Sequence, residues 1–424
     1  MGYNFFNIKN VKESFNRKLK DFVLSLGKAI GNGEDIPFAD NDVTYTLKLQ
    51  HERIKDKGLE MEYEVYSRDP ERNDFIAGSN WRDRHYESVV CFRQCGVKRR
   101  VKRNGKKIYR DNQKCVLYEV MTDVVTGEHP DNDTFCCPNC GAATTIAELQ
   151  NGCSYCGTRY KMDDLFPKVT GYYFLDDVGM AGNEGKAGIF LSIFGGMLLV
   201  VGIGVLFNLK KIMAGDIETL LGLLCAGPFL GGFMGYFMFG MFLLIRMIAK
   251  AIATSGKMGT AGSRRKFENR MKKLSPEFSF EYFTSKAISL IKTAVYSKNP
   301  QELLFYEGES LDPRMKDIID LNYGGALGLE YFEEKDGIAT VVVDAYFDVL
   351  YATDRGVKYK HQVFSALLRR RTDIPFNYNF SMTRIACPTC GSSFDATKNR
   401  ICPNCGNPYE MISDDWVLSK IKIK

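Results

Sequence analysis

Eight cysteines fall into two similar groups of four, and each group consists of two Cys-x-x-Cys pairs. The first group occurs in "CPNCGAATTIAELQNGCSYCG" and the second in "CPTCGSSFDATKNRICPNCG". Zinc prefers a tetrahedron of thiolate or imidazole ligands, and two such pairs can supply it without a large hydrophobic core. We therefore predict two structural zinc ions. Their ligands are Cys137, Cys140, Cys153 and Cys156 in the first site and Cys387, Cys390, Cys402 and Cys405 in the second.

A glycine follows each of these pairs, and glycine tolerates the positive φ that turns peptide N–H groups toward the sulfurs. A redox dithiol and lasting disulfides are the alternatives to zinc. Two matched pairs per group favour a closed metal site over a single catalytic pair, and a cytoplasmic location disfavours disulfides. Because the protein fills all four positions, we expect no zinc-activated water.

A catalytic site is not predicted. The sequence has no phosphate-cradling glycine loop, serine elbow, His-Glu-x-x-His motif or cysteine-histidine pair, and its four histidines are scattered. Asp344 and Asp348 lie on one face of a predicted strand, but acidic pairs are common on exposed strand faces. We expect a protein that is not an enzyme.

The segment "KRRVKRNGKKIYR" predicts a basic hairpin with its turn at Asn104-Gly105. Like charges that face each other across a hairpin repel, so this tip should lie in water or bind an anion. Anionic lipid headgroups are favoured over nucleic acid, because Tyr109 alone provides little base stacking. The basic residues are Lys98, Arg99, Arg100, Lys102, Arg103, Lys106, Lys107 and Arg110, eight charges in a chain whose net charge is +6.

Two uncharged apolar runs, 187–207 and 219–245, are each long enough to cross a bilayer core of ~30 Å as a helix. A soluble helical hairpin is the alternative. No signal peptide opens the chain, and a cluster of Lys and Arg follows the second run. The positive-inside tendency then places the following segment in the cytoplasm, and two crossings return the preceding segment there. We expect a multi-pass protein of the cell membrane with both termini cytoplasmic.

Small residues recur every fourth position in both apolar runs. Such a stripe lets helix backbones approach closely in lipid, so we expect pairing within the hairpin or a homo-oligomer formed between copies. No Asp, Glu, Lys, Arg or His lies in either run, which argues against a pump or an ion-coupled transporter. The stripes comprise Gly188, Ser192 and Gly196, then Gly227, Gly231 and Gly235.

After the apolar runs, an aromatic helical stripe beginning at Phe280 precedes segments rich in β-branched residues, which predicts an antiparallel sheet packed on helices. With its "NPQELLFYEGESL" continuation, the region 267–371 resembles the domain of the forty-four-kilodalton subunit of the mitochondrial inner-membrane translocase and of its bacterial relatives. The resemblance implies a cone-shaped, nuclear-transport-factor-two-like α+β fold with an apolar pocket for membrane association or docking. Phe280, Phe283 and Tyr346 are candidate pocket residues, with core positions as the alternative.

The cysteine groups resemble zinc ribbons, including those of general transcription factors, which bind nucleic acid, bind protein or brace a domain end. In both groups, Tyr and Met follow the last cysteine at the same distances, which suggests an internal duplication. These residues are Tyr160 and Met162 in the first group and Tyr409 and Met411 in the second. The chain resembles membrane-tethered bacterial proteins that combine these parts more than it resembles the mitochondrial subunit. We therefore do not expect a role in mitochondrial import.

The expected architecture is an α+β multidomain membrane protein. Its parts are an N-terminal α+β cytoplasmic domain (1–135), zinc ribbons (136–166 and 385–412), transmembrane helices (187–207 and 219–245), a basic linker (246–266) and the translocase-subunit-like domain (267–371). The expected function is a scaffold or tether that contacts membrane lipid and binds a protein, a peptide or a lipid headgroup. The alternatives are a membrane-tethered nucleic-acid-binding regulator that uses the ribbons and the basic hairpin, and a redox sensor.

Overall fold

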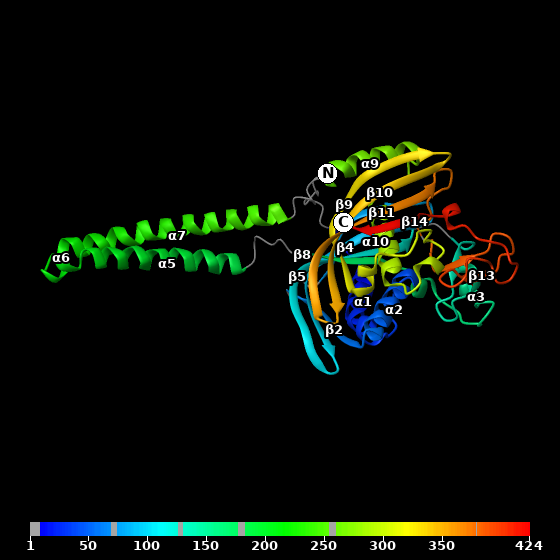
Figure 1. The fold of residues 1–424 in the computed structure, drawn as a ribbon, viewed down its shortest axis with the longest axis horizontal. Helices are drawn as coiled ribbons and strands as arrows, with labels where there is room; N and C mark the ends of the chain where they lie inside the picture. Colours follow the sequence, from blue (N-terminus) through cyan, green and yellow to red (C-terminus); the bar gives the residue numbers. More distant parts are fainter. Residues whose placement is uncertain (1–8, 69–73, 126–129, 177–182, 254–259, 379) are drawn as a thin grey trace. The chain divides into compact units, whose positions relative to one another are not determined.

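The computed structural model describes residues 9–68, 74–125, 130–176, 183–253, 260–378 and 380–424 (Figure 1). The chain divides into two compact units. One unit combines Met1–Asp177 with Gly259–Lys424, and the other is Val178–Met258. The regions before and after the apolar segment, treated as separate domains in the sequence analysis, therefore belong to one compact unit. The first unit combines helices and strands, and the described residues of the second form helices.

The first half of the compact unit packs two helices on an antiparallel sheet. The amphipathic helix α1 (Glu13–Asn32) buries Phe15, Leu19, Phe22 and Leu26 and ends at Gly33, whose φ is 71°. The helix α2 (Asn41–Asp56) follows. The strands are β1 (Lys9–Asn10), β2 (Leu59–Ser67), β3 (Ile76–Arg82), β4 (Tyr86–Arg103), β5 (Lys106–Val124) and β8 (Lys168–Asp176), in the order β1-β3-β4-β5-β8, with β2 also paired to β4.

The second half has helices and an antiparallel sheet of its own. The helices are α9 (Thr260–Leu274) and α10 (Phe280–Tyr296), and single 3-10 turns lie at Pro300–Glu302 and Pro313–Asp317. The strands are β9 (Ile318–Lys335), β10 (Ile338–Thr353), β11 (Gly356–Arg371) and β14 (Val417–Ile423), in the order β14-β11-β10-β9. The predicted antiparallel sheet packed on helices is confirmed.

The two halves repeat one architecture. Each runs through two helices, long antiparallel strands, a cysteine group, one helical turn and a last strand that pairs back with the strand before the cysteine group. In the first half β2 and β3 together take the place of β9, because they pair with the two ends of β4 as β9 pairs with both ends of β10. The two helical turns are α4 (Met162–Leu165) and η4 (Met411–Ser413).

The repeat extends to the hydrogen-bond register. In the pairing of β5 with β8, Leu117 lies opposite Phe174. The register shifts three residues further along β5, between Val120 and Met121. In the pairing of β11 with β14, Phe364 lies opposite Ile423. The register again shifts three residues further along, between Leu367 and Leu368 of β11. A β-bulge changes the direction of a strand at one position. Because both halves have a bulge at the equivalent position, their backbones follow the same path there.

The hairpin of β4 and β5 is longer than the corresponding hairpin of β10 and β11 in the second repeat. The strands β4 and β5 have 18 and 19 residues, whereas β10 and β11 have 16 each. Asn104 and Gly105 form the turn with φ values of 51° and 71°, the left-handed conformation that suits an Asn-Gly hairpin. The predicted basic hairpin is confirmed as an element.

Buried polar contacts join the two repeats. Thr46 of α2 and Thr293 of α10 share a hydrogen bond of 2.7 Å between their hydroxyls. At the sheet edges, the Asn322 side chain of β9 donates to the Phe174 carbonyl (2.6 Å) and accepts from the Phe174 N–H (3.0 Å). The hydrophobic cores also mix, since Leu350 of the second repeat packs in the core under α1. The repeats form one body.

The second unit is a helical hairpin made of α5 (Asn183–Phe207), α6 (Leu209–Met213) and α7 (Ile217–Ala253). Two segments, Gly188–Phe207 and Ile217–Phe242, are long and apolar enough to cross a membrane. Of the predicted basic linker 246–266, residues 246–253 end α7 and 260–266 begin α9, whereas 254–259 lie outside the described residues.

The predicted small-residue stripes lie between α5 and α7 of the same hairpin. A Cβ placed on Gly196 would lie 2.2 Å from the Gly231 carbonyl oxygen, and one on Gly235 would lie 2.0 Å from the Ser192 carbonyl oxygen. No side chain larger than hydrogen fits at that distance. Of the two predicted uses of the stripe, the structure therefore has the pairing within the hairpin.

Candidate metal centres

Short hairpins position the first cysteine pair of each group. In the first group β6 (Thr134–Cys136) pairs with β7 (Ala143–Thr145), and in the second β12 (Arg384–Ala386) pairs with β13 (Ser393–Asp395). The Cys-x-x-Cys pair occupies the turn of each hairpin. The second pair lies on a following loop, which brings the two pairs together from different parts of the chain.

The four glycines close four turns of the same form. The N–H of Gly141 donates to the Cys137 carbonyl and that of Gly391 to the Cys387 carbonyl, both at 2.8 Å. All four glycines have φ values of 72° or 73°, a conformation that a Cβ would strain. The positive φ predicted from sequence is thus observed at Gly141, Gly157, Gly391 and Gly406.

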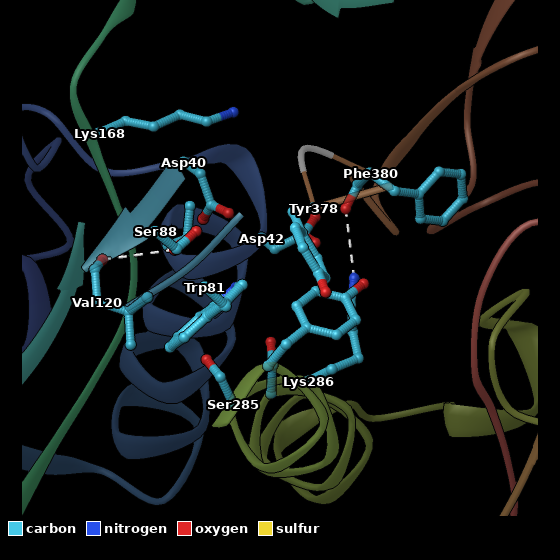
Figure 2. Close-up of a pocket in the computed structure, with 13 residues that line it drawn as sticks. Asp40, Asp42, Trp81, Ser88, Val120, Lys168, Ser285, Lys286, Tyr378 and Phe380 are labelled. Atoms are coloured by element: carbon cyan, nitrogen blue, oxygen red, sulfur yellow. Dashed lines mark hydrogen bonds between the residues drawn. The ribbon is translucent and has the colours of Figure 1, made fainter. Parts of the chain in front are cut away.

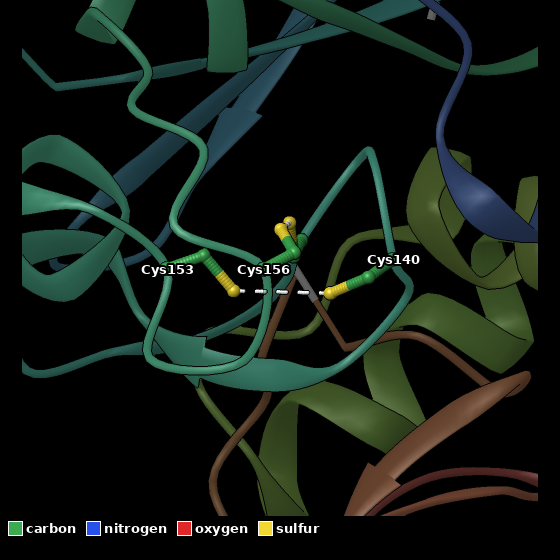
Figure 3. A group of neighbouring side chains, drawn as sticks. Cys140, Cys153 and Cys156 are labelled. Carbon is green, nitrogen blue, oxygen red and sulfur yellow. Dashed lines mark hydrogen bonds between the residues drawn. The ribbon is translucent and has the colours of Figure 1, made fainter.

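The eight predicted ligands meet in two groups of four whose Sγ atoms all lie within 4.8 Å of one another. In the first group the Sγ atoms of Cys140 and Cys153 are 3.8 Å apart (Figure 3). Those of Cys137 and Cys156 are 3.7 Å apart. A disulfide would need about 2.05 Å. A tetrahedron with metal–sulfur bonds of about 2.3 Å has edges of about 3.8 Å. The sulfur positions therefore fit a metal ion in each group.

Side-chain amides connect the two pairs within each group. The Asn139 amide donates to Cys156 Sγ at 3.6 Å and to Thr158 Oγ1 at 3.0 Å. In the second group, Asn404 makes the matching contacts with Cys390 Sγ at 3.6 Å and Ser392 Oγ at 2.8 Å. Hydrogen bonds to ligand atoms orient them for a metal.

Hydrogen bonding also favours the thiolate form of one cysteine in each group. The hydrogen bond with the Thr158 hydroxyl lowers the pKa of Cys156 to about 6. In the second group, the hydrogen bond with the Ser392 hydroxyl lowers the pKa of Cys390 to about 6. Thiolate is the form that binds a metal ion.

The two cysteine groups lie against each other within the compact unit. A Cβ added to Gly141 would lie 3.0 Å from a guanidinium nitrogen of Arg384, which belongs to the second group's hairpin. The second group is fixed further by Arg400, which donates to the carbonyls of Gln301, Leu303 and Tyr306.

Half of the predicted patch of eight basic residues is paired with acidic side chains. Lys98 pairs with Glu64 at 3.3 Å, and Arg100 pairs with Glu62 at 3.1 Å. Lys102 also pairs with Glu62, and these two contacts lower the pKa of that carboxyl. The strand β2 supplies both acids because its register places them opposite the basic residues of β4.

Two other members of the patch are used to join the repeats. Arg99 is buried and pairs with Asp111 at 2.6 Å and with Asp320 of the second repeat at 2.7 Å. Arg103 donates to the carbonyls of Thr353 and Asp354. Lys106, Lys107 and Arg110 are exposed and have no acidic partner among the described residues. Four of the eight predicted residues thus have acidic partners, and anion binding by the hairpin stays a prediction.

The three candidate pocket residues do not share a pocket. Phe280 and Phe283 are buried in the core, and Phe283 packs edge-on against Phe267 and Trp416. Tyr346 is half-buried on β10, where its neighbours Ala345 and Phe347 face that core, so its own side chain points to the opposite face. Phe280 and Phe283 are therefore core residues, which was the alternative to a pocket position.

The other cysteines stay outside the metal groups. Cys91, Cys95, Cys115 and Cys136 are buried, and Cys225 is exposed on α7. Burial raises the pKa of Cys136 to about 12, which suits an inert thiol.

Together, the fold and its sites define a chain of two α+β repeats, each with a four-cysteine group whose sulfur positions fit a metal ion, interrupted by an apolar helical hairpin. No protein-family model, no curated protein and no solved structure matches this chain. The function must therefore be argued from the geometry of the chain itself.

Proposed function

We propose that this chain is a membrane-anchored scaffold without enzymatic activity, whose two zinc-braced repeats bind a protein, a peptide or a lipid headgroup at the cytoplasmic face of the cell membrane. One observation carries the proposal: the segments on both sides of the helical hairpin belong to a single compact unit. A folded unit cannot be divided by a bilayer, so both ends of the hairpin must emerge on the same side.

The side chains of the hairpin support an anchor in lipid. Its small residues face inward at the seam, while Phe190 of α5 and Phe229 and Phe233 of α7 are more than two-thirds exposed. A soluble helical hairpin hides its large apolar side chains, whereas helices in lipid pack through small residues and turn large ones outward. The basic residues that follow α7 in the sequence favour the cytoplasmic side for the compact unit.

Zinc is the metal that this ligand chemistry favours. Four thiolates in a tetrahedron suit zinc or iron, and zinc forms closed four-cysteine sites that stabilise small folds without redox chemistry. Because the cysteines fill every position, such an ion would brace the ribbons and would not activate water. Structural zinc couples ~10–16 kcal/mol of binding to folding in small domains.

Exposed apolar side chains beside the metal ligands support a protein or peptide partner. The compact unit exposes few large apolar side chains among its described residues, namely Leu24, Tyr155, Tyr331 and Ile401. Tyr155 lies between Cys153 and Cys156, and Ile401 directly precedes Cys402. Exposed apolar groups on rigid turns are typical of docking surfaces. The nucleic-acid alternative loses support because four of the eight basic residues of the hairpin are already paired with acidic side chains.

Topology mapping tests the proposal. We expect the protein to stay with membranes during alkaline extraction, and we expect both the N-terminal and the C-terminal tag to resist protease added outside intact cells. Permeabilised cells provide the control, in which both tags should be removed. A protein that stays soluble without detergent, or a tag lost from intact cells, would overturn the proposal.

A further inference from the structure

The cavity at the seam between the repeats is lined by ionisable side chains that hold the fold together (Figure 2). Lys286 pairs with Asp415 at 2.7 Å and donates to the Phe380 carbonyl at 3.3 Å. Asp42 accepts a hydrogen bond of 2.8 Å from the Ser381 hydroxyl. These contacts fix the chain between β11 and β12 to α2 and α10, so Lys286 and Asp42 have structural roles. A group of reactive side chains without such a role lies elsewhere, in the sheet of the first repeat.

Two thiols meet inside this sheet. Cys95 of β4 lies directly opposite Cys115 of β5 in the strand register. Their Sγ atoms are 3.3 Å apart, whereas the sulfur pairs of the first four-cysteine group are 3.7 and 3.8 Å apart. Among the described residues, no third cysteine, histidine or carboxylate joins the two thiols in a group that could hold a metal ion. The pair is therefore a dithiol outside the candidate metal centres.

The backbone around this pair already has the spacing of a disulfide. Residues directly opposite each other in antiparallel strands have Cα atoms about 4.5–5.5 Å apart, and disulfides join Cα atoms about 4.4–6.8 Å apart. The S–S bond is about 2.05 Å long, so the two sulfurs need to approach by little more than ~1 Å. The one register shift between β4 and β5 lies further along, between Val101 and Lys102. A disulfide can thus form here without a change in strand pairing.

Burial restricts which oxidant can reach the pair. Cys95 is 0% exposed and Cys115 is 3% exposed, and both belong to the hydrophobic core under α1. A bulky oxidant needs extensive unfolding to enter such a core. Hydrogen peroxide is close to water in size, and a local opening of the core is enough to admit it.

The surroundings of Cys95 favour its reactive form. The hydrogen bond with the Cys115 thiol lowers the pKa of Cys95 against the effect of burial, and Arg93 acts in the same direction. Glu119 is fully buried, and burial raises its pKa well above the usual range, so it adds no opposing negative charge. Cys91 lies opposite Glu119 instead of a thiol, and burial raises its pKa to about 12. Because the thiolate is the nucleophile, Cys95 is the reactive cysteine of this strand.

We propose that Cys95 and Cys115 form a redox-modification site, which hydrogen peroxide converts into a cross-strand disulfide. The Cys95 thiolate attacks one peroxide oxygen and the O–O bond breaks, which leaves Cys95 as a sulfenic acid and releases water once the departing hydroxide takes up a proton. The Cys115 sulfur then attacks the sulfenic sulfur, so that the S–S bond forms, the S–O bond breaks and a second water leaves with the Cys115 proton. The two thiols lose two electrons and two protons, and the peroxide gains them. A small dithiol reverses the step by thiol–disulfide exchange.

The disulfide closes a loop that contains the basic hairpin tip. Cys95 and Cys115 are 20 positions apart, and Arg99, which pairs with Asp320 of the second repeat, lies between them. A cross-link stabilises a fold by restricting its unfolded chain. Oxidation therefore stabilises the part of β4 and β5 that joins the repeats. The proposal does not rest on the scaffold function.

Peptide mass spectrometry of the full-length protein tests the site. The reduced protein, in detergent and with zinc supplied, is treated with hydrogen peroxide, and the remaining thiols are then alkylated. We expect a cross-linked peptide pair that joins Cys95 to Cys115, lacks two hydrogens and returns to two free thiols with dithiothreitol. The oxidised protein should have a higher thermal midpoint than the same sample after dithiothreitol.

Matched variants connect the stability change to the pair. Cys91→Ala removes a buried thiol from the same strand but keeps the pair, so it should form the cross-link and gain stability as the wild type does. Cys115→Ala should gain neither.

The wild-type peptides give a result even where a variant fails to fold. Cys95 and Cys115 that stay free in the folded, peroxide-treated wild type would refute the proposal, and so would cross-links formed only by the other cysteines. An equal rise of the thermal midpoint in folded Cys115→Ala would refute it too.

Discussion

At the residue scale, a candidate metal site is defined by the cysteines whose sulfur atoms lie close together. Cys153 belongs to the first four-sulfur group, whereas the buried Cys136, next to the ligand Cys137, belongs to neither group. Both are buried thiols in the same cysteine-rich segment. Comparing the serine variants of the two residues therefore distinguishes a loss of metal binding from a loss of packing.

We expect Cys153→Ser to reduce the zinc content from about two ions per chain to about one, because three thiolates no longer close the tetrahedron. Cys136→Ser should retain both ions. Elemental analysis of the folded fraction after gel filtration measures the ratio. Equal loss in the two variants would show that packing governs the content, and iron in the wild-type protein would replace zinc in the proposal.

The Asp40 carboxylate makes stability depend on pH. Burial, with a smaller contribution from Asp42, raises its pKa to about 7, while Lys168 and Lys286, which also face it, act in the opposite direction. An unfolded aspartate has a pKa of about 3.9. Between these two pH values the folded state binds more protons than the unfolded state, so this group lowers stability as pH rises from about 4 to 7.

Asp40→Asn keeps an oxygen that can accept the Val43 N–H but cannot ionise. We expect its thermal midpoint to fall less than that of the wild type between pH 5 and pH 8. Asp131→Asn, at an exposed aspartate, is the control and should follow the wild-type profile. Parallel profiles for Asp40→Asn and the wild type would contradict the assignment.

At the element scale, strand pairing decides what the basic hairpin can bind. The sequence predicted the basic residues of the hairpin but not the acidic side chains that pair with them. Glu62 and Glu64 alternate along β2, a signal of one strand face, yet only the register of β2 against β4 shows that they meet Arg100 and Lys98. Arg99 could not be placed at all from sequence, because its partner Asp320 lies in the other repeat.

The remaining free charges should govern lipid contact. We expect a Lys106→Gln, Lys107→Gln, Arg110→Gln variant to lose most binding to phosphatidylserine vesicles, since each contacting basic residue contributes ~1 kcal/mol. The matched variant Lys98→Gln, Arg100→Gln, Lys102→Gln removes equal charge but loses surface ion pairs worth ~0–1 kcal/mol each. Vesicle co-flotation with protein held in neutral-lipid nanodiscs compares them, and equal binding losses would contradict a role for the tip.

The helical hairpin offers a paired test at adjacent glycines. A Cβ at Gly196 would lie 2.2 Å from the Gly231 carbonyl oxygen, whereas one at Gly195 meets nothing within 4 Å. We expect Gly196→Ala to force α5 and α7 apart and lower the thermal midpoint in detergent. Gly195→Ala should leave it unchanged or raise it, because alanine favours helix over glycine by up to ~1 kcal/mol. The reverse order would show that the helices do not pair through this stripe.

At the scale of the whole molecule, the sequence predicted the parts better than their assembly. Cysteine spacing, apolar length and strand patterning are local signals, and they predicted the cysteine groups, the two long apolar helices and the second antiparallel sheet. The contacts that make one unit of two repeats are not local. Gln50 reaches the Asp320 carboxylate across 270 positions, and Thr46 meets Thr293 across 247. No periodicity in the chain records such pairs.

Arg99 is the clearest test of that assembly. Its side chain is 3% exposed and holds Asp111 of its own repeat and Asp320 of the other. We expect Arg99→Met to destabilise the compact unit by about 3–5 kcal/mol, because it leaves two carboxylates without their buried partner. Denaturant unfolding measures this loss.

Arg100→Met is the matched control, since Arg100 is adjacent in sequence, 44% exposed and paired with Glu62 at the surface. It should cost less than ~1 kcal/mol. Wild-type protein should unfold the compact unit in one transition, because the cores of the repeats are shared. Two separate transitions in the wild type, or equal effects of the two substitutions, would mean that the repeats fold independently. The argument that both ends of the hairpin lie on one side of a bilayer would then lose its basis.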